Sequence, residues 1–302
     1  MTTTIYSQIS RNKRNTWLII ISFIIFVSFL GWFTGQVFFE GSGTFFVLLA
    51  LIFSGFSCLV SYFESDKIIL AVSGAREVAT EENKYLHNLV ENLCIGAGLP
   101  KPRIYIINDT SMNAFATGRD PSHSIICFTS GIVEKLTKLE LEGVIAHELS
   151  HIGNYDIGLM SIVTVLVGTV VLISDWVTRG MFYGGRRKSS SSNSEISGIL
   201  MIVGLVLLIL SPIIATLMQL AISRDREYLA DSSAALLTRY PDGLASALKK
   251  LSQDTEILEA ANRATSHLYI ANPIKSENQG FLASIYDTHP PIGERINRLE
   301  EM

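Results

Sequence analysis

The sequence has few charged residues, few cysteines and no excess of positive charge, and each shortage excludes a class of protein. Charged side chains make up 17% of its 302 residues, against about 25% in a typical soluble domain. The three cysteines contain no CxxC pair, so neither a disulfide framework nor a zinc ribbon is indicated. A net charge of −4 provides no electrostatic basis for binding nucleic acid, and an apolar content of 48% excludes a disordered chain.

In place of charge, the chain has four long apolar runs. Two lie near the N-terminus, at residues 17–39 and 41–63, and two lie in the second half, at 157–174 and 196–223. A helix needs about 20 apolar residues to cross a bilayer, so only the third run is marginal. We therefore predict an integral membrane protein with about four transmembrane helices. A buried core helix is the alternative for the third run.

Charges beside these runs predict the orientation of the chain. Arg11, Lys13 and Arg14 precede the first run and favour a cytosolic N-terminal tail over residues 1–16. The first run is too long for a signal peptide and no clear cleavage site follows it, which favours an uncleaved anchor. A Gly/Ser-rich loop at 184–195 carries three cations, and these conflict with the orientation if the third and fourth runs both cross fully.

The rest of the chain forms two polar blocks, residues 64–156 and 224–302, which together are long enough for one compact domain. A transmembrane hairpin over 157–223 separates the blocks, so both lie on one side of the membrane. We predict a mainly α-helical domain with a small β-sheet at about 103–129. A two-helix transmembrane anchor over 17–63 attaches it to the membrane.

The chemistry begins with His147, Glu148 and His151, which form an HExxH motif. The segment is predicted to be helical, because Thr137 and Glu140 have the spacing of a capping box at its start. Residues four apart share one helix face, so the two imidazoles can bind one metal ion and Glu148 can address a water molecule on it. The motif therefore predicts a catalytic centre with one Zn²⁺ per chain.

Two histidines leave such a centre incomplete, because a catalytic zinc ion generally has three protein ligands and a water molecule. No third histidine follows at short spacing, where Tyr155 and Asp156 stand instead. Glu227 and Asp231 lie four residues apart after the fourth run. Glu227 could bind the metal while Asp231 accepts a hydrogen bond from a ligating imidazole. On spacing alone, a solvated helix face that pairs with Arg224 explains these two acids equally well.

Together these motifs resemble those of the M48 family of zinc metallopeptidases. The resemblance covers nearly the whole chain: two N-terminal spans, HELSH at 147–151, SRDREYLAD at 223–231 and THPPIGERINRLE at 288–300. HExxH alone occurs in many metalloproteases, whereas its combination with the two later motifs is far more specific. The resemblance implies an integral membrane, zincin-like metallopeptidase, with 64–156 as the first part of its catalytic domain and 224–302 as the second.

The resemblance also implies roles for individual residues. His147, His151 and Glu227 match the zinc ligands of the family, and Glu148 matches its general base. Asp231 matches the acid that supports a ligating histidine.

Three further assignments rest on the resemblance. His289 matches a histidine that steadies the oxyanion, and the two prolines after it fix the adjacent backbone. Arg295 stands at the equivalent downstream position, without a clear role. Four residues resemble an edge strand that holds the substrate backbone, and an exposed edge could pair with an extended peptide. These four residues are Asn113, Ala114, Phe115 and Ala116.

The function implied by the resemblance is that of a membrane-anchored zinc endopeptidase. It hydrolyses membrane or misfolded proteins, as part of membrane protein quality control and the stress response. The implied location is the bacterial cytoplasmic membrane, crossed several times, with the active site facing the cytosol. Polypeptide substrates and the lipid bilayer are the expected partners.

Three alternatives remain open. An intramembrane protease would carry HExxH within a span, which Lys138, Glu140 and Glu142 on the same helix disfavour. A prenyl-protein protease of the same broad family is disfavoured, because longer chains with more spans are typical of such enzymes. A membrane scaffold or an inactive protease is disfavoured by the intact ligands and the intact base.

Overall fold

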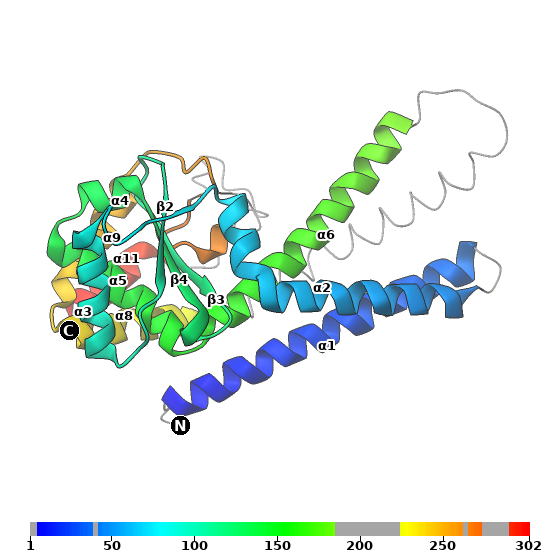
Figure 1. Ribbon diagram of the computed structural model, residues 1–302, viewed down its shortest axis with the longest axis horizontal. Coiled ribbons are helices and arrows are strands. Elements are labelled where there is room, and N and C mark those ends of the chain that lie inside the picture. The colour runs from blue at the N-terminus through cyan, green and yellow to red at the C-terminus, as the bar shows by residue number, and fades with distance from the viewer. Residues whose placement is uncertain (1–4, 39–41, 185–223, 262–264, 274–289) are drawn as a thin grey trace.

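The computed structural model of the protein describes residues 5–38, 42–184, 224–261, 265–273 and 290–302. Within these residues, three long helices extend from a domain that surrounds a small sheet (Figure 1). Helices α1 (Ile5–Phe38) and α2 (Gly43–Val72) run side by side, and α6 (Asp156–Gly184) leaves the same side of the domain and diverges from them. Because α1 begins at Ile5, most of the segment predicted as a tail is helical.

Helices α1 and α2 are both long and apolar enough to cross a membrane, with candidate spans at Ile9–Phe33 and Gly43–Val72. Their large apolar side chains are exposed, as Ile25 at 64%, Ile52 at 70% and Phe56 at 67% illustrate. Such exposure costs free energy in water, whereas the acyl chains of a bilayer accommodate it. Both helices therefore have the surface of membrane-spanning helices.

The marginal third run lies in α6, and its first turns are buried in protein. Ile157, Leu159 and Ile162 are each 1% exposed or less. Helix α6 counts towards a span only together with the helix before it, from which it is bent by 82°. The described residues therefore contain two candidate spans, or three if the bent pair is one span. The fourth predicted run, 196–223, lies outside them, as does nearly all of the predicted loop at 184–195, so the total of four stays a prediction.

The sheet has four strands in the order β1-β2-β4-β3. β1 (Arg76–Glu77) and β3 (Ala114–Gly118) are antiparallel to their neighbours, whereas β2 (Arg103–Ile107) and β4 (Ser124–Thr129) are parallel to each other. The predicted small sheet at 103–129 is confirmed, and β1 adds a short strand that was not predicted. β3 is an edge strand of this sheet.

Both faces of the sheet are buried, because alternate side chains of β4 enter two different cores. Ile126 and Phe128 pack into the cluster formed by the helices of the domain. Ile125 and Cys127 pack in a second cluster, with residues at the base of α2 and α6. The two-residue period of a strand produces this division. The sheet therefore lies between the bases of the long helices and the helices that carry the candidate site.

Six α-helices and two 3-10 helices complete the described domain. They are α3 (Lys84–Ala97), α4 (Ser130–Lys135), α5 (Lys138–Gly153), α8 (Arg224–Thr238), α9 (Pro241–Gln253), α11 (Ile292–Glu300), η1 (Pro121–His123) and η2 (Ser266–Leu268). Helix α5 is central, because α3, α8 and α9 all contact it. Gly143 permits the close approach of α9, since an added Cβ there would lie 2.7 Å from the backbone nitrogen of Leu244.

Candidate metal centre

Helix α5 presents the two histidines, and its cap determines where the helix begins. The Thr137 hydroxyl accepts a hydrogen bond from the Glu140 backbone, and the Glu140 carboxylate accepts one from the Thr137 backbone, which confirms the predicted capping box. His147 and His151 lie one turn apart on this helix and are 1% and 6% exposed. The helical spacing therefore brings both imidazoles to one buried face.

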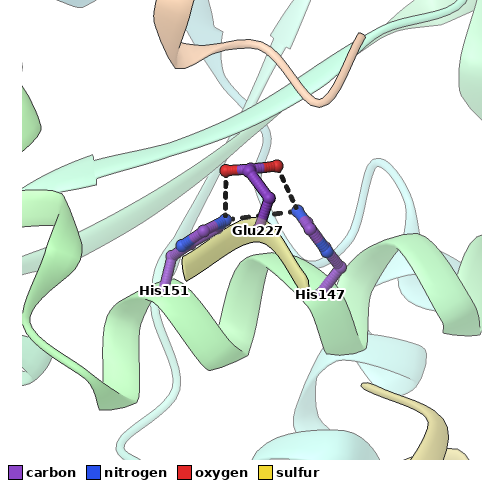
Figure 2. A group of neighbouring side chains, drawn as sticks. All are labelled: His147, His151 and Glu227. Atoms are coloured by element: carbon purple, nitrogen blue, oxygen red, sulfur yellow. Dashed lines mark hydrogen bonds and ion pairs between the residues drawn. The ribbon is translucent and has the colours of Figure 1, made fainter. Parts of the chain in front are cut away.

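Glu227 reaches these imidazoles from a second helix, α8 (Figure 2). The ligand atoms of His147, His151 and Glu227 all lie within 4.8 Å of one another, and all three side chains are buried. The two Nε2 atoms are 3.2 Å apart. The Glu227 carboxylate oxygens lie 3.5 Å from His151 Nε2 and 3.7 Å from His147 Nε2. The structure thus brings together the three residues predicted as metal ligands.

The spacing and the donor chemistry of this cluster both fit a zinc ion. Two ligands at about 2.0–2.1 Å from a tetrahedral zinc ion lie roughly 3.4 Å apart, close to the distances between these side chains. The atoms that converge are imidazole nitrogens and carboxylate oxygens, which act as acceptors when the histidines are neutral. Buried acceptors that face one another are unfavourable unless a positive charge lies between them. The cluster therefore has the composition of a cation site.

Asp231 and Arg295 hold the first of the two histidines. Asp231 Oδ1 accepts a hydrogen bond from His147 Nδ1 at 2.9 Å. Arg295 donates to both Asp231 oxygens, at 2.8 and 2.7 Å, and to the Ile270 carbonyl at 2.9 Å. Burial lowers the pKa of His147, so a neutral ring keeps its proton on Nδ1 and directs the Nε2 lone pair at the metal position. Arg295 is only 1% exposed, and its contacts give it the role that the sequence left open.

Asp156 holds the second histidine in the same way, a role that its place in the sequence did not predict. It is 1% exposed at the start of α6, and its Oδ2 accepts a hydrogen bond from His151 Nδ1 at 3.0 Å. The available signal was an acid five residues beyond the second histidine. That signal is weak, because only the 82° bend between α5 and α6 turns the carboxylate back towards the ring.

The cluster favours positive charge even before a metal ion is considered. Burial acts to lower the pKa of His151, but the hydrogen bond to Asp156 and the nearby carboxylate of Glu227 outweigh it and raise that pKa to about 9. A site that stabilises an imidazolium also attracts a metal cation. Zinc binding would therefore displace a proton from this histidine.

Glu148 lies beside the ligands and is 2% exposed. Burial raises its pKa to about 7, although a hydrogen bond from the Ala116 backbone on the edge strand β3 partly opposes this shift. A carboxyl group whose pKa lies near neutrality can both accept and release a proton. Its position and its pKa suit the predicted role of general base.

The predicted substrate strand, residues 113–116, lies at the sheet edge but is not open along its whole length. All five residues of β3 are buried. The Ala114 carbonyl already accepts a hydrogen bond from the Ile270 backbone at 2.9 Å. The middle of the strand faces the catalytic side, because the Ala116 backbone hydrogen-bonds to Glu148. A peptide that paired with Ala114 would have to displace the segment around Ile270.

One predicted site residue, His289, lies outside the described residues, so its position stays a prediction. The next residue, Pro290, is buried, and α11 begins at Ile292. Arg295 on that helix contacts Asp231. The chain therefore returns to the metal centre immediately after the predicted histidine.

Comparisons with known proteins relate the chain to one peptidase family. The sequence model of peptidase family M48 matches residues 80–302. A protein named Protease HtpX homolog from Dictyoglomus thermophilum is 47% identical over 299 residues, which cover 99% of this chain and 95% of the relative. A protein of the same name from Tropheryma whipplei is 46% identical over 297 residues, which cover 98% of each chain.

A solved structure shares the fold. The crystal structure of S. mikatae Ste24p matches with a TM-score of 0.53 and covers 98% of this chain and 67% of that chain. The sequence identity is 19%, so the likeness concerns the fold alone. Because the match spans nearly the whole chain, it includes the long helices as well as the domain.

Proposed function

The chain belongs to peptidase family M48, and from this membership we propose that it is a zinc-dependent endopeptidase anchored in a membrane. As a member of this family and a relative of the HtpX homologues, it is a protease and acts on polypeptides. We extend this assignment to a zinc requirement and to roles for individual residues.

One observation carries the proposal. The buried ligand atoms of His147, His151 and Glu227 converge within 4.8 Å, next to the buried carboxyl group of Glu148. Three protein ligands leave one position of a tetrahedral zinc site open for water or substrate, which is typical of catalytic rather than structural sites. When bound, a zinc ion would lower the pKa of the water molecule it holds and would polarise the scissile carbonyl group.

The side chains around the metal position have three further roles: proton transfer, orientation of the ligating rings and stabilisation of the oxyanion. Glu148, which is buried beside the ligands, removes the proton of the attacking water and later delivers it to the leaving amine. Asp231 and Asp156 keep the two ligating rings oriented by accepting hydrogen bonds from their Nδ1–H groups. His289 hydrogen-bonds to the developing oxyanion, a contribution that is worth several kcal/mol in related chemistry, about 3–4.

We propose that the substrate lies extended along β3, with Ala116 at the centre of the strand nearest to Glu148. Pairing of this kind uses main-chain hydrogen bonds, so it accepts many sequences and suits unfolded segments. The metal centre adjoins the start of α6, because Asp156 is the first residue of that helix. A site so close to the long helices suits membrane or misfolded proteins as substrates, in a quality-control role.

We also propose the full topology. Four transmembrane helices anchor the chain in the bacterial cytoplasmic membrane, and the catalytic domain faces the cytosol. Residues 64–156 and 224–302 form that domain, and the hairpin 157–223 divides it. The cations Arg11, Lys13 and Arg14 and the bacterial origin of the relatives support this arrangement.

Peptidase activity tests the proposal directly. Wild-type protein and Glu148→Gln would be purified in detergent with Zn²⁺ and incubated with casein as an unfolded substrate. We expect one zinc ion per chain in both proteins and cleavage by the wild type alone, because glutamine cannot accept the proton. Glu142→Gln is the matched control, since Glu142 lies on the same helix and pairs only with Lys138 in the described structure, at 3.7 Å.

Two results would contradict the proposal. Cleavage by Glu148→Gln at the wild-type rate would remove Glu148 from the mechanism. A wild-type protein that binds no zinc and cuts no substrate would favour the membrane scaffold instead.

A further inference from the structure

Helix α1 is more than an anchor, because it places a buried amide beside the metal centre. Asn12 lies in the first turn of the candidate span Ile9–Phe33 and is only 3% exposed. A buried polar side chain costs free energy unless it is hydrogen-bonded. Asn12 Nδ2 donates to the Asn154 carbonyl at 2.9 Å and to Asp156 Oδ1 at 2.6 Å. The amide thus joins α1 to the bend between α5 and α6.

The two carboxylate oxygens of Asp156 contact different partners. Oδ1 accepts the hydrogen bond from Asn12 and lies 3.5 Å from Arg226 Nη1. Oδ2 accepts the hydrogen bond from His151 at 3.0 Å. A single carboxylate therefore separates the α1 amide from a metal ligand.

The orientation of the Asn12 amide is determined by its partners. Its Oδ1 accepts a hydrogen bond from Arg226 Nη1 at 3.2 Å, so its Nδ2 must face Asp156. Arg226 immediately precedes Glu227, the third ligand. Asn12 is therefore connected to both helices that carry metal ligands, through one contact on each side.

These contacts have a chemical consequence for the metal. The carboxylate behind a ligating imidazole fixes the ring and its tautomer, and its loss typically lowers metal affinity by about 10–100-fold. Among the contacts that the Asp156 carboxylate makes with Asn12, His151 and Arg226, the one with Asn12 is the shortest. Without that donor, the carboxylate would be free to turn away from His151.

We propose that Asn12 is a positioning residue of the metal centre, so that the zinc affinity of the protein depends on the docking of the membrane helix α1. This inference rests on the proposed zinc site. Because linkage between two binding events is reciprocal, a bound zinc ion also strengthens the docking of α1 on the domain. The metal centre is then complete only when the membrane anchor is in place.

Zinc affinity is the primary test. The full-length protein in detergent would be titrated against a chromogenic zinc chelator, as wild type, Asn12→Ala and Thr16→Ala. We expect the zinc dissociation constant of Asn12→Ala to rise by about tenfold or more. Thr16→Ala is the matched control and should leave the constant unchanged, because Thr16 lies one turn further on the same helix and its hydroxyl bonds only to the Asn12 carbonyl in the described structure.

Exchanging the amide of Asn12 and the carboxylate of Asp156 distinguishes an effect on the position of the metal ligand from a general loss of folding. Asn12→Asp alone sets two carboxylates against each other and should weaken zinc binding further than Asn12→Ala. The double variant Asn12→Asp/Asp156→Asn restores a donor and an acceptor between positions 12 and 156 and still offers His151 an amide oxygen, and the hydrogen bond that it loses is the one to the Asn154 carbonyl. We expect it to bind zinc more tightly than either single variant. Melting temperatures of the metal-free proteins will show whether each variant is folded.

Hydrogen exchange supplies the reciprocal measurement, since zinc should slow exchange in the docked first turns of α1. The inference is overturned if Asn12→Ala binds zinc as tightly as wild type, if Thr16→Ala weakens binding equally, or if the double variant is no better than the single ones. The proposed function fails separately. A wild type that binds no zinc overturns both, whereas a zinc-binding wild type with an unaffected Asn12→Ala overturns only this inference.

Discussion

The two imidazoles of the metal centre are held by different regions of the molecule. His147 is backed by Asp231, which Arg295 anchors from the C-terminal helix α11, wholly within the domain. His151 is backed by Asp156, which Asn12 anchors from the long helix α1. The metal centre thus has two halves, each with a carboxylate that supports an imidazole. The half around His147 depends on the folding of the domain, and the half around His151 depends on the docking of a membrane helix.

The two halves of the metal centre therefore form in different steps: one when the domain folds, and the other when helix α1 docks on the domain. The guanidinium of Arg295 is buried and makes a two-pronged contact with Asp231, so that half is built when the domain folds. The half that contains Asp156 needs a helix whose outer surface is suited to lipid rather than water. A change in the membrane anchor can therefore alter the position of His151 while His147 stays in place.

The largest effect is expected where a buried charge loses its partner. Arg295→Ala leaves the Asp231 carboxylate uncompensated in the core, and we expect a loss of about 3–5 kcal/mol in the free energy of unfolding. Zinc binding should fall with it. Denaturant titration of the metal-free protein and metal analysis would measure the two effects.

Arg298→Ala is the control on the same helix. The Arg298 guanidinium lies 3.6 Å from the ring centre of Tyr228 and is exposed, so its removal should cost about 0.5–1 kcal/mol. If Arg295→Ala and Arg298→Ala lowered the free energy of unfolding equally, the buried contact between Arg295 and Asp231 would not be what stabilises this part of the metal centre.

A double-mutant cycle would sharpen the comparison between the halves. Asp231→Asn and Asp156→Asn should each weaken zinc binding by about 10–100-fold. Adding Asn12→Ala should weaken Asp231→Asn further, because the two changes lie in different halves. It should add little to Asp156→Asn, because Asn12 acts through that carboxylate. Full additivity with Asp156→Asn would show that Asn12 reaches the metal by another route.

The smallest effect on the metal is expected at the far end of α5. Burial acts to raise the pKa of Glu140, but hydrogen bonds from Lys250, Ser246 and the Thr137 backbone outweigh it and lower that pKa to about 2. Glu140→Gln should cost about 1.5–3 kcal/mol of stability at neutral pH and leave zinc affinity unchanged.

The size of this effect depends on pH. A carboxylate whose pKa is lowered by folding stabilises the protein above its ordinary pKa of 4.5, and this contribution disappears as the pH falls towards 2. The stability difference between wild type and Glu140→Gln should therefore shrink over that range. Melting curves of the metal-free proteins at several pH values would measure it. A difference that stays constant with pH would contradict the lowered pKa.

Local features of the chain were predictable because their physics is local. The capping box of Thr137 and Glu140 formed as predicted, since the two residues are three positions apart on the first turn of one helix. His147 and His151 share a face for the same reason. The sheet at 103–129 formed as predicted, whereas β1 has only two residues and left no recognisable pattern.

Contacts between distant segments were harder to predict. On spacing alone, Glu227 and Asp231 suited a solvated face, but the structure leaves them 1% and 2% exposed, so that alternative is wrong. Their burial follows from the packing of α8 against α5, which no local pattern of charges indicates. The family resemblance, rather than the spacing, favoured the metal site.

By itself, the sequence determined which groups could do the chemistry: an HExxH helix with a defined start, two acids four residues apart, and apolar runs long enough for a bilayer. Only the tertiary structure decided which acid supports which imidazole. Asn12 and Asp156 are 144 residues apart in the sequence, and the packing of α1 against α6 brings their side chains within 2.6 Å of each other. Helical spacing and hydrophobic length are properties of a short segment, whereas such a contact exists only after separate helices have packed together.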